Sequence, residues 1–322
     1  MPYGHRAVSP PQGWLWLAVG VVVLVALDAG ARLRSAVRWT VAVGSACAAF
    51  LVLPAVAAPG AGGLEIHFLD LGQGDAVAIR TPADRWLLVD AGPREERYDA
   101  GERRVLPFLR SHRVRRLEAL VLTHPHADHI GGAPAVLRGV EVGRVIEPGL
   151  PFGTPLYLET LRTAEVRGAA WAAARQGRTL SLDGVTLEFL WPEEGALESV
   201  SDANTVSAVI HLRYGSFAAL LTGDAGEMEE VAMLERYGDA LRVQVLKAGH
   251  HGSRTSTSAA LLDRVRPELV VVSAGRRNRY GHPAPEVLER LRARGIPVAR
   301  TDREGTVSVR VGAGGEWERA EP

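Results

Sequence analysis

Cysteine and lysine are almost absent from this sequence of 322 residues. Its one cysteine, Cys47, cannot form a disulfide within the chain, and a thiolate cluster for a metal is excluded with it. Only Lys247 among the 37 basic residues is a lysine, so arginine-rich stretches carry little functional information and the single lysine carries more. The 37 acidic residues balance the basic ones, which excludes a protein that binds polyanions through its overall charge.

Charged residues are also scarce in the first 63 positions. Residues 14–27 and 39–58 are apolar, with Arg32, Arg34 and Arg38 between them, and a bilayer span takes about 20 residues. The pattern fits a hairpin of two membrane helices, a cleaved signal sequence, or one helix with its amino end outside. We favour the hairpin of two membrane helices. Both this hairpin and a cleaved signal sequence place the rest of the chain outside the cytoplasm, whereas a single helix with its amino end outside would place it inside.

The chain is therefore divided into three parts. Residues 1–63 are expected to be a membrane anchor with a short linker, residues 64–312 a large domain, and residues 313–322 a tail. Short strands alternate with helices from residue 65 onward, which fits mixed sheets between helix layers in the α/β (α+β) class. We expect an alanine-rich helix over residues 155–176, with Trp171 on its apolar side, and a final hairpin over 297–300 and 307–311.

The densest group of polar residues is His124-Pro125-His126-Ala127-Asp128-His129. It follows the apolar run 117–122, which is typical of a buried strand, and precedes two glycines and a short helix. Burying these side chains without hydrogen-bond partners would cost several kcal/mol each. Imidazoles and carboxylates are also the usual ligands of zinc and manganese. His124 and His126 suit one ion, and Asp128 and His129 a second. A histidine-rich surface loop is the alternative, and the preceding strand disfavours it.

The motif His-x-His-x-Asp-His resembles the hallmark of the metallo-β-lactamase superfamily. Further segments resemble, in the same order, the carboxyl-terminal hydrolase domain of the ComEC family of bacterial DNA-uptake channel proteins: 68–76, 221–224, 246–253 and 280–283. This resemblance covers residues 64–311 and implies a four-layer αββα sandwich with two divalent ions, zinc or manganese. The sequence has no polytopic channel region, so we expect that it does not translocate DNA by itself.

The resemblance also implies the ligands of the two ions. His124, His126 and Asp224 are assigned to the first ion, and Asp128, His129, Asp224 and a later histidine to the second, so that Asp224 bridges them. For the later histidine we prefer His250 to His282, because His250 directly follows a predicted strand. From the residues alone, Asp224 is better explained as the cap of the helix expected over 225–237, and only the other motifs favour a metal ligand. Many members of the superfamily have a third histidine for the first ion, where this chain has Asn204 and Ser207 instead.

The remaining roles concern catalysis and substrate. Asp128 is expected to act in catalysis, with His251 and His282 as candidates for protonating the leaving oxygen. Asp70 and Asp90 are expected to orient the metal ligands and their loops through hydrogen bonds, without binding the metal themselves. We expect the following residues to contact substrate: Gln73, Asp75, Asn204, Ser207, Lys247 and Ser253. If Lys247 holds a phosphate oxygen, Lys247→Arg should cut activity with little loss of stability; the alternative is a surface lysine at a strand edge.

These expectations combine into a function. The sequence favours a membrane-anchored hydrolase with two metal ions that cleaves phosphodiesters in DNA, single-stranded DNA in particular, on the outer face of a bacterial membrane. Its partners would be the lipid membrane and a separate DNA-uptake channel protein. Two alternatives remain: a hydrolase of the same fold acting on a lactone, a β-lactam or a non-nucleic phosphodiester, and a DNA-binding component of an uptake machine without catalytic activity.

Overall fold

Strands of three to seven residues, most of them rich in apolar residues, build two sheets that pack against each other. The computed structural model describes residues 62–198, 200 and 202–320, and the apolar stretches 14–27 and 39–58 lie outside this range. Among the helices of the described range, none has both the length and the apolar character that a bilayer span requires.

The first sheet has eight strands in the order β10-β9-β7-β3-β2-β1-β18-β19. The four strands from β10 to β3 are parallel to one another, so their carboxyl ends lie at one edge. The strands are β1 (Leu64–Phe68), β2 (Val77–Arg80), β3 (Trp86–Val89), β7 (Ala119–Val121), β9 (Arg144–Glu147), β10 (Ala170–Ala173), β18 (Val307–Val311) and β19 (Trp317–Ala320).

The second sheet has seven strands in the order β11-β12-β13-β14-β15-β16-β17. Its last four strands are parallel. The strands are β11 (Thr179–Leu182), β12 (Val185–Trp191), β13 (Val209–Tyr214), β14 (Phe217–Leu221), β15 (Val245–Lys247), β16 (Leu269–Val272) and β17 (Val298–Arg300).

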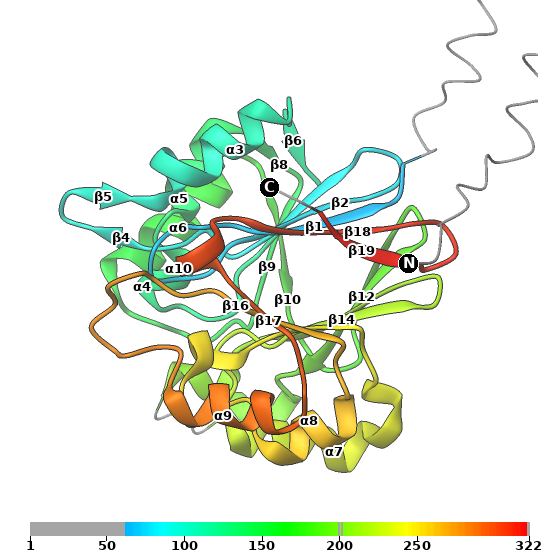
Figure 1. Cartoon of the computed structure of the whole chain (residues 1–322). Helices are drawn as coiled ribbons and strands as arrows, with labels where there is room; N and C mark the ends of the chain where they lie inside the picture. Colours follow the sequence, from blue (N-terminus) through cyan, green and yellow to red (C-terminus); the bar gives the residue numbers. More distant parts are fainter. Residues whose placement is uncertain (1–61, 199, 201, 321–322) are drawn as a thin grey trace, which may run out of the picture. The chain divides into compact units, whose positions relative to one another are not determined.

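One apolar core lies between the sheets and two more lie beneath the helices. Phe68 and Val89 of the first sheet share the central core with Phe189 and Phe217 of the second. The outer face of the first sheet is covered by α3 (Leu106–Ser111), α5 (Ala133–Gly139) and α6 (Pro155–Val166), and that of the second by α7 (Glu227–Tyr237), α8 (Ala259–Val265) and α9 (Pro285–Ala293). The layers are therefore helix, sheet, sheet and helix, which confirms the predicted αββα sandwich (Figure 1).

Short elements connect these layers. They are β4 (Arg94–Glu95), β5 (Tyr98–Asp99), η1 (Gly101–Val105), β6 (Arg116–Leu117), α4 (Ala127–Ile130), β8 (Glu141–Val142), η2 (Glu194–Leu197), η3 (Ala203–Val206), η4 (Gly238–Leu241), η5 (Gly249–Gly252) and α10 (Thr301–Glu304).

The structure corrects two expected elements. The helix expected over 155–176 ends at Val166, and Gly168, with φ of +73°, turns the chain into the edge strand β10. Trp171 on that strand is 56 % exposed and donates a hydrogen bond to Glu147. The expected final hairpin is also wrong, because β17 pairs with β16 in one sheet and β18 pairs with β1 in the other. The helix α10 carries the chain between the two sheets.

Candidate metal centre

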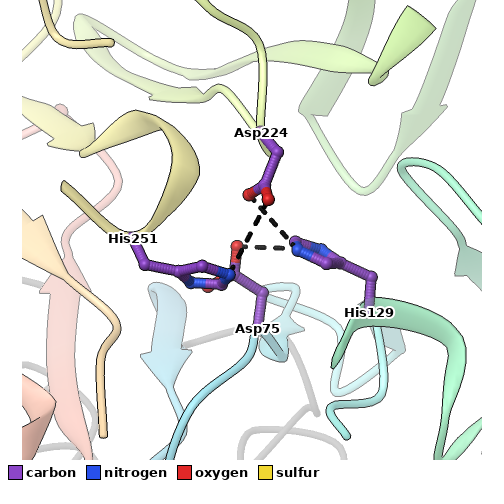
Figure 2. A group of neighbouring side chains, drawn as sticks. All are labelled: Asp75, His129, Asp224 and His251. Atoms are coloured by element: carbon purple, nitrogen blue, oxygen red, sulfur yellow. Dashed lines mark ion pairs between the residues drawn. The ribbon is translucent and has the colours of Figure 1, made fainter. Parts of the chain in front are cut away.

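Loops from both sheets bring their polar side chains together at one edge of the sandwich. Asp75 lies in the loop after β1, and the segment His124–His129 follows β7. From the second sheet, Asp224 follows β14 and His251 follows β15. Figure 2 shows that His129 and His251 face each other, with Asp224 on one side of the pair and Asp75 on the other.

Four ligand-type side chains form the buried centre of this site. The ligand-type atoms of Asp75, His129, Asp224 and His251 all lie within 4.8 Å of one another. Asp224 Oδ1 is 3.2 Å from His129 Nε2, and Asp224 Oδ2 is 3.8 Å from His251 Nε2. The carboxylate of Asp128 completes this side, with Oδ2 at 3.3 Å from His251 Nε2.

The atoms that face this centre lack hydrogen-bond partners. Within the described part of the chain, His129 Nε2, His251 Nε2 and Asp224 Oδ1 are buried and accept or donate no hydrogen bond. Unpartnered buried polar atoms are expensive, and native proteins rarely leave several of them together. Imidazole nitrogens and carboxylate oxygens are also the donor set that zinc and similar cations take. The residues present therefore fit a divalent metal ion.

His124 and His126 form a second group beside Asp224. His124 Nε2 lies 3.0 Å from His126 Nδ1 and 3.9 Å from Asp224 Oδ2. Burial, followed by the charge of His129, holds the pKa of His124 well below its usual value, so this imidazole is neutral and can bind a cation. The distances leave Asp224 between the two groups, as a bridging carboxylate requires.

Ser207 and Asn204 occupy the region where a third histidine was sought. The hydroxyl of Ser207 accepts a hydrogen bond from the backbone N–H of Asp224 at 2.9 Å and lies 3.4 Å from His124 Nδ1. Ser207 is fully buried, so it positions the bridging carboxylate and has no exposed surface for substrate. Asn204 is partly exposed, and its buried Oδ1 has no hydrogen-bond partner within the described ranges.

Asp90 fixes the orientation of the metal loop. It accepts hydrogen bonds from the backbone N–H of Thr123 at 2.7 Å, from the Thr123 hydroxyl at 2.8 Å and from His129 Nδ1 at 2.8 Å. A carboxylate on the Nδ1 side of an imidazole turns Nε2 toward a metal. Burial lowers the pKa of His129, but the carboxylates of Asp224 and Asp90 outweigh it and raise the pKa well above its usual value. Asp70, in contrast, accepts a bond from Gly72 N–H and shapes the adjacent turn.

Asp75 and Lys247 form a buried ion pair behind the histidines. Asp75 is 2 % exposed and Lys247 1 %, and the Lys247 ammonium also donates to the carbonyl of Gly223 at 3.1 Å. Asp75 Oδ1 lies 3.5 Å from His251 Nδ1, and Oδ2 lies 3.9 Å from His129 Nδ1. Burial raises the pKa of Asp75, but Lys247 and His251 outweigh it and hold the pKa well below its usual range. Neither residue is at the surface, where contact with substrate was expected.

The paired histidines after β15 differ in burial and direction. His251 is 1 % exposed, and its pKa is raised to about 9, because Asp224 and Asp75 outweigh the lowering by burial. The His250 side chain is 30 % exposed, with Nε2 at 3.6 Å from Asp224 Oδ2. His282 is farther out, its ring 5.7 Å from that of His250. Burial, followed by the charges of His251 and His250, lowers the pKa of His282 to about 4. Of these three histidines, His251 is therefore the one that the geometry favours as the later metal ligand beside the carboxylates.

The two remaining expected contacts, Gln73 and Ser253, belong to loops at the edge of the site. Gln73 Oε1 accepts a hydrogen bond from Gly275 N–H at 3.1 Å, and the Ser253 hydroxyl lies 3.0 Å from that of Thr255. Thr123, which donates hydrogen bonds to Asp90, and Asn278, whose amide donates to the carbonyls of Gly275 and His282, are positions that the sequence interpretation missed. Thr123 directly precedes the histidine motif, and Asn278 lies within an arginine run that was discounted because the whole chain is rich in arginine.

Comparison with known proteins identifies the family. The Metallo-beta-lactamase superfamily profile matches residues 69–276. The chain belongs to the metallo-β-lactamase superfamily. Within this superfamily, the αββα sandwich with a histidine and aspartate cluster is a metal-dependent hydrolase fold, and the cluster described above is the candidate metal site.

Curated relatives include two competence proteins. Competence protein ComA of Neisseria gonorrhoeae is 36 % identical over 307 residues, which are 95 % of this chain and 40 % of that protein. ComE operon protein 3 of Bacillus subtilis is 30 % identical over 317 residues, 94 % of this chain and 39 % of that protein. The chain thus spans about two fifths of the length of these relatives. The resemblance to competence proteins predicted from the sequence is confirmed.

Solved structures agree on the fold. CmlA, a diiron β-hydroxylase from Streptomyces venezuelae, superimposes with a TM-score of 0.53 and 17 % identity, over 78 % of this chain and 54 % of that one. At this identity the likeness concerns the fold alone.

Proposed function

We propose that this metallo-β-lactamase domain is a nuclease that hydrolyses phosphodiester bonds in DNA with two divalent ions, zinc or manganese. The observation that carries the proposal is Asp224, which lies between two histidine groups and has an unpartnered buried oxygen. The competence proteins among the relatives support DNA as the substrate.

The proposed ligands follow the geometry. His124, His126 and Asp224 would hold the first ion, and Asp128, His129, Asp224 and His251 the second, so that His251 replaces His250 in the assignment from sequence. Two ions held in this way lower the pKa of water and neutralise charge on a phosphate. A His251 bound to metal is no longer available as a proton donor.

The chain itself orients the reacting groups. Asp90 and Ser207 fix His129 and Asp224 by the hydrogen bonds described above, so the ligands are preorganised. His282 is neutral at pH 7 because its pKa is lowered to about 4. It therefore donates a hydrogen bond to a leaving oxygen and does not protonate it as an imidazolium.

The setting is proposed from the sequence and the relatives. The amino-terminal apolar stretches would anchor the chain in a bacterial cell membrane, with the hydrolase domain outside the cytoplasm. A separate DNA-uptake channel would be its protein partner. The competence proteins that it matches support this role.

One cleavage experiment tests the nuclease proposal. The 322-residue chain is incubated with end-labelled single-stranded or double-stranded DNA and manganese or zinc, with Asp128→Ala as the matched control. We expect metal-dependent cleavage that the control loses. No cleavage by the parent chain with either metal would overturn the proposal.

Two alternatives predict different outcomes in the same assay. A hydrolase for other substrates would cleave nitrocefin, a lactone or bis-p-nitrophenyl phosphate and leave DNA intact. The absence of a third histidine beside His124 and His126 supports the other alternative, a non-catalytic DNA-binding component. That reading predicts fewer than one ion per chain, DNA binding and no cleavage.

A further inference from the structure

A groove of about 530 Å³ opens beside Asp128. Its lining includes the loop after β16, with Arg276, Arg277, Arg279 and Tyr280, and the segment that contains Glu95. The groove therefore joins the candidate metal centre to a basic and aromatic loop.

The loop has a defined conformation that depends on Asn278. The side-chain amide of Asn278 donates hydrogen bonds to the carbonyls of Gly275 at 2.8 Å and His282 at 2.6 Å. Its Oδ1 accepts hydrogen bonds from the backbone N–H groups of Tyr280 at 3.1 Å and His282 at 2.9 Å. Gln73 binds the start of the loop through Gly275 N–H. The loop thus presents its outer side chains from a preorganised backbone.

Within the described residues, the three arginines of the loop are exposed and form no ion pair, although Arg276 donates a hydrogen bond to the carbonyl of Asp302 and Arg279 donates one to the hydroxyl of Tyr280. In the described residues, no carboxylate lies within 4.0 Å of the guanidinium of Arg276, Arg277 or Arg279. Other exposed arginines of this chain form ion pairs, as Arg264 does with Asp239 and Arg294 with Asp263.

Unpaired guanidinium groups beside a groove suit phosphate oxygens, which they bind through paired N–H groups. The lining also contains the carboxylates of Glu95 and Asp128. Asp128 belongs to the candidate metal centre, so a bound cation offsets its charge. Glu95 disfavours a phosphate beside it, so the phosphates lie along the arginines.

Aromatic rings lead from the metal centre to the surface along this loop. The ring of His251, which is buried, lies 6.4 Å from that of His282 at 29°. The ring of His282 lies 5.7 Å from that of Tyr280 at 22°, and Tyr280 is 54 % exposed. Rings at these distances and angles stack in an offset manner. The guanidinium of Arg279 lies 5.0 Å from the centroid of the Tyr280 ring, so a base that stacks on Tyr280 takes the place of this exposed side chain and continues the row of rings toward the candidate metal ligands.

We propose that this groove binds a single-stranded nucleic acid, with phosphates on Arg276, Arg277 and Arg279 and a base stacked on Tyr280. The inference rests on the proposed nuclease function and adds to it the strand-binding site and a structural reason for the expected preference for single strands. The preference follows because the bases of a duplex are stacked on one another and present no free ring face to Tyr280.

The arginine contacts are tested by the salt dependence of binding. A labelled single-stranded phosphorothioate oligonucleotide, which resists cleavage, is titrated with the 322-residue chain at a fixed manganese concentration, and affinity is measured by fluorescence anisotropy at several salt concentrations. Each phosphate contact contributes about 0.7 to the slope of log affinity against log salt, so R276Q/R277Q/R279Q should lower the slope by about 2. Arg242→Gln is the control, because Arg242 is exposed and precedes the amino end of β15, opposite the site.

The stacking contact is tested at Tyr280. Tyr280→Ala should weaken single-strand binding by about tenfold, and Tyr280→Phe should bind like the parent, because stacking needs the ring and not the hydroxyl. A duplex of the same sequence should bind more weakly than the single strand. Each variant is checked for an unchanged melting temperature, so that lost binding is not lost folding.

The outcomes separate this inference from the nuclease proposal. Parental affinity and salt slope in the triple arginine variant would overturn the inference, even if the parent chain cleaves DNA. Equal loss in Arg242→Gln would overturn it as well, since a diffuse charge effect would then explain binding. If the loop variants lose single-strand binding while no metal supports cleavage, the inference stands and the nuclease proposal fails.

Discussion

At the scale of single residues, the buried pair of Lys247 and Asp75 explains why this arginine-rich chain keeps one lysine. The ammonium is 1 % exposed and reaches both Asp75 and the carbonyl of Gly223. A lysine offers a compact charge with three donors, whereas a guanidinium is larger and planar. The pair in turn holds Asp75 against the Nδ1 atoms of the histidines that face the metal centre.

Breaking this pair should be costly, and removing it entirely should be much less so. Lys247→Met leaves the Asp75 carboxylate buried without its cation and should lower the free energy of unfolding by about 3–5 kcal/mol. The double variant with Asp75→Asn carries no buried charge at either position and should recover at least half of that loss. Urea unfolding of the parent, both single variants and the double variant measures the coupling.

A double variant as unstable as Lys247→Met would contradict this account. The burial also revises the expectation for Lys247→Arg, because a buried site must repack around the larger group. That variant should lose stability as well as activity, in contrast to the expectation from sequence.

His211 gives a pH dependence that does not involve the metal centre. It lies on β13, where burial, followed by the charge of Arg213, lowers its pKa to about 4. As the pH falls, the unfolded chain takes up this proton near pH 6.5, before the folded chain does, so stability is lost between pH 6.5 and 4. His211→Phe should remove about 2 kcal/mol of the loss between pH 7 and pH 5, measured by urea unfolding at both values. An unchanged acid sensitivity would contradict the assignment.

At the scale of elements, strands were predictable where apolar and polar residues alternate. The short strands expected from residue 65 onward are present, as in β1, where Glu65 and His67 alternate with apolar residues. The prediction of a helix over 155–176 was wrong at its carboxyl end. Alanine favours a helix locally, but pairing with β9 makes the segment the edge strand β10. The prediction of a hairpin after residue 297 was wrong because the local sequence pattern does not indicate which sheet each strand joins.

The candidate site was also predicted only in part from the sequence. The cluster from His124 to His129 was predicted from residue types after a strand, and the bridging role of Asp224 only from the resemblance to the metallo-β-lactamase superfamily. The place of His251 beside the carboxylates was not predicted, because both His250 and His251 adopt left-handed backbone conformations, with φ of 46° and 55°, which aim the second ring inward. Such paired left-handed residues are strained and are maintained by their surroundings, so local sequence does not reveal them.

The loop after β1 supports a prediction about this element. A Cβ on Gly74 would lie 2.4 Å from the carbonyl oxygen of Asp128, whereas a Cβ on Gly72 would meet nothing within 4 Å. Both glycines have positive φ, so both alanine variants carry backbone strain of about 1–2 kcal/mol. Gly74→Ala must also displace the metal loop, and it should lower the free energy of unfolding by about 3 kcal/mol and weaken metal binding at least tenfold.

Gly72→Ala is the matched control for backbone strain. It should lose stability without losing metal affinity, which a competition titration with a zinc-binding dye measures. Equal effects of the two variants would show that strain alone, and not the contact with the Asp128 loop, explains them.

At the scale of the whole molecule, the metal centre joins the two sheets. The loop after β7 in the first sheet supplies His129, and the loops after β14 and β15 in the second sheet supply Asp224 and His251. Four carboxylates, those of Asp75, Asp90, Asp128 and Asp224, gather there with one ammonium. Without a metal ion, protonated His129 and His251, whose pKa values are raised, offset much of this negative charge, and a bound metal ion takes over that role.

Metal binding should therefore stabilise the whole fold and not only the site. At a free metal concentration about a thousand times the dissociation constant, the folded state gains about 4 kcal/mol, or roughly 10 °C in melting temperature for a domain of this size. Asp224→Ala should abolish this gain, since Asp224 lies between both groups of ligands. In chelator the same variant should lose stability near neutral pH, because it removes the carboxylate that raises the pKa of His129 and His251. Calorimetry with and without manganese or zinc measures both quantities. An equal metal-induced rise in parent and variant would place the bound ion elsewhere, and unchanged stability of the variant in chelator would contradict the pairing of Asp224 with the two histidines in the absence of metal.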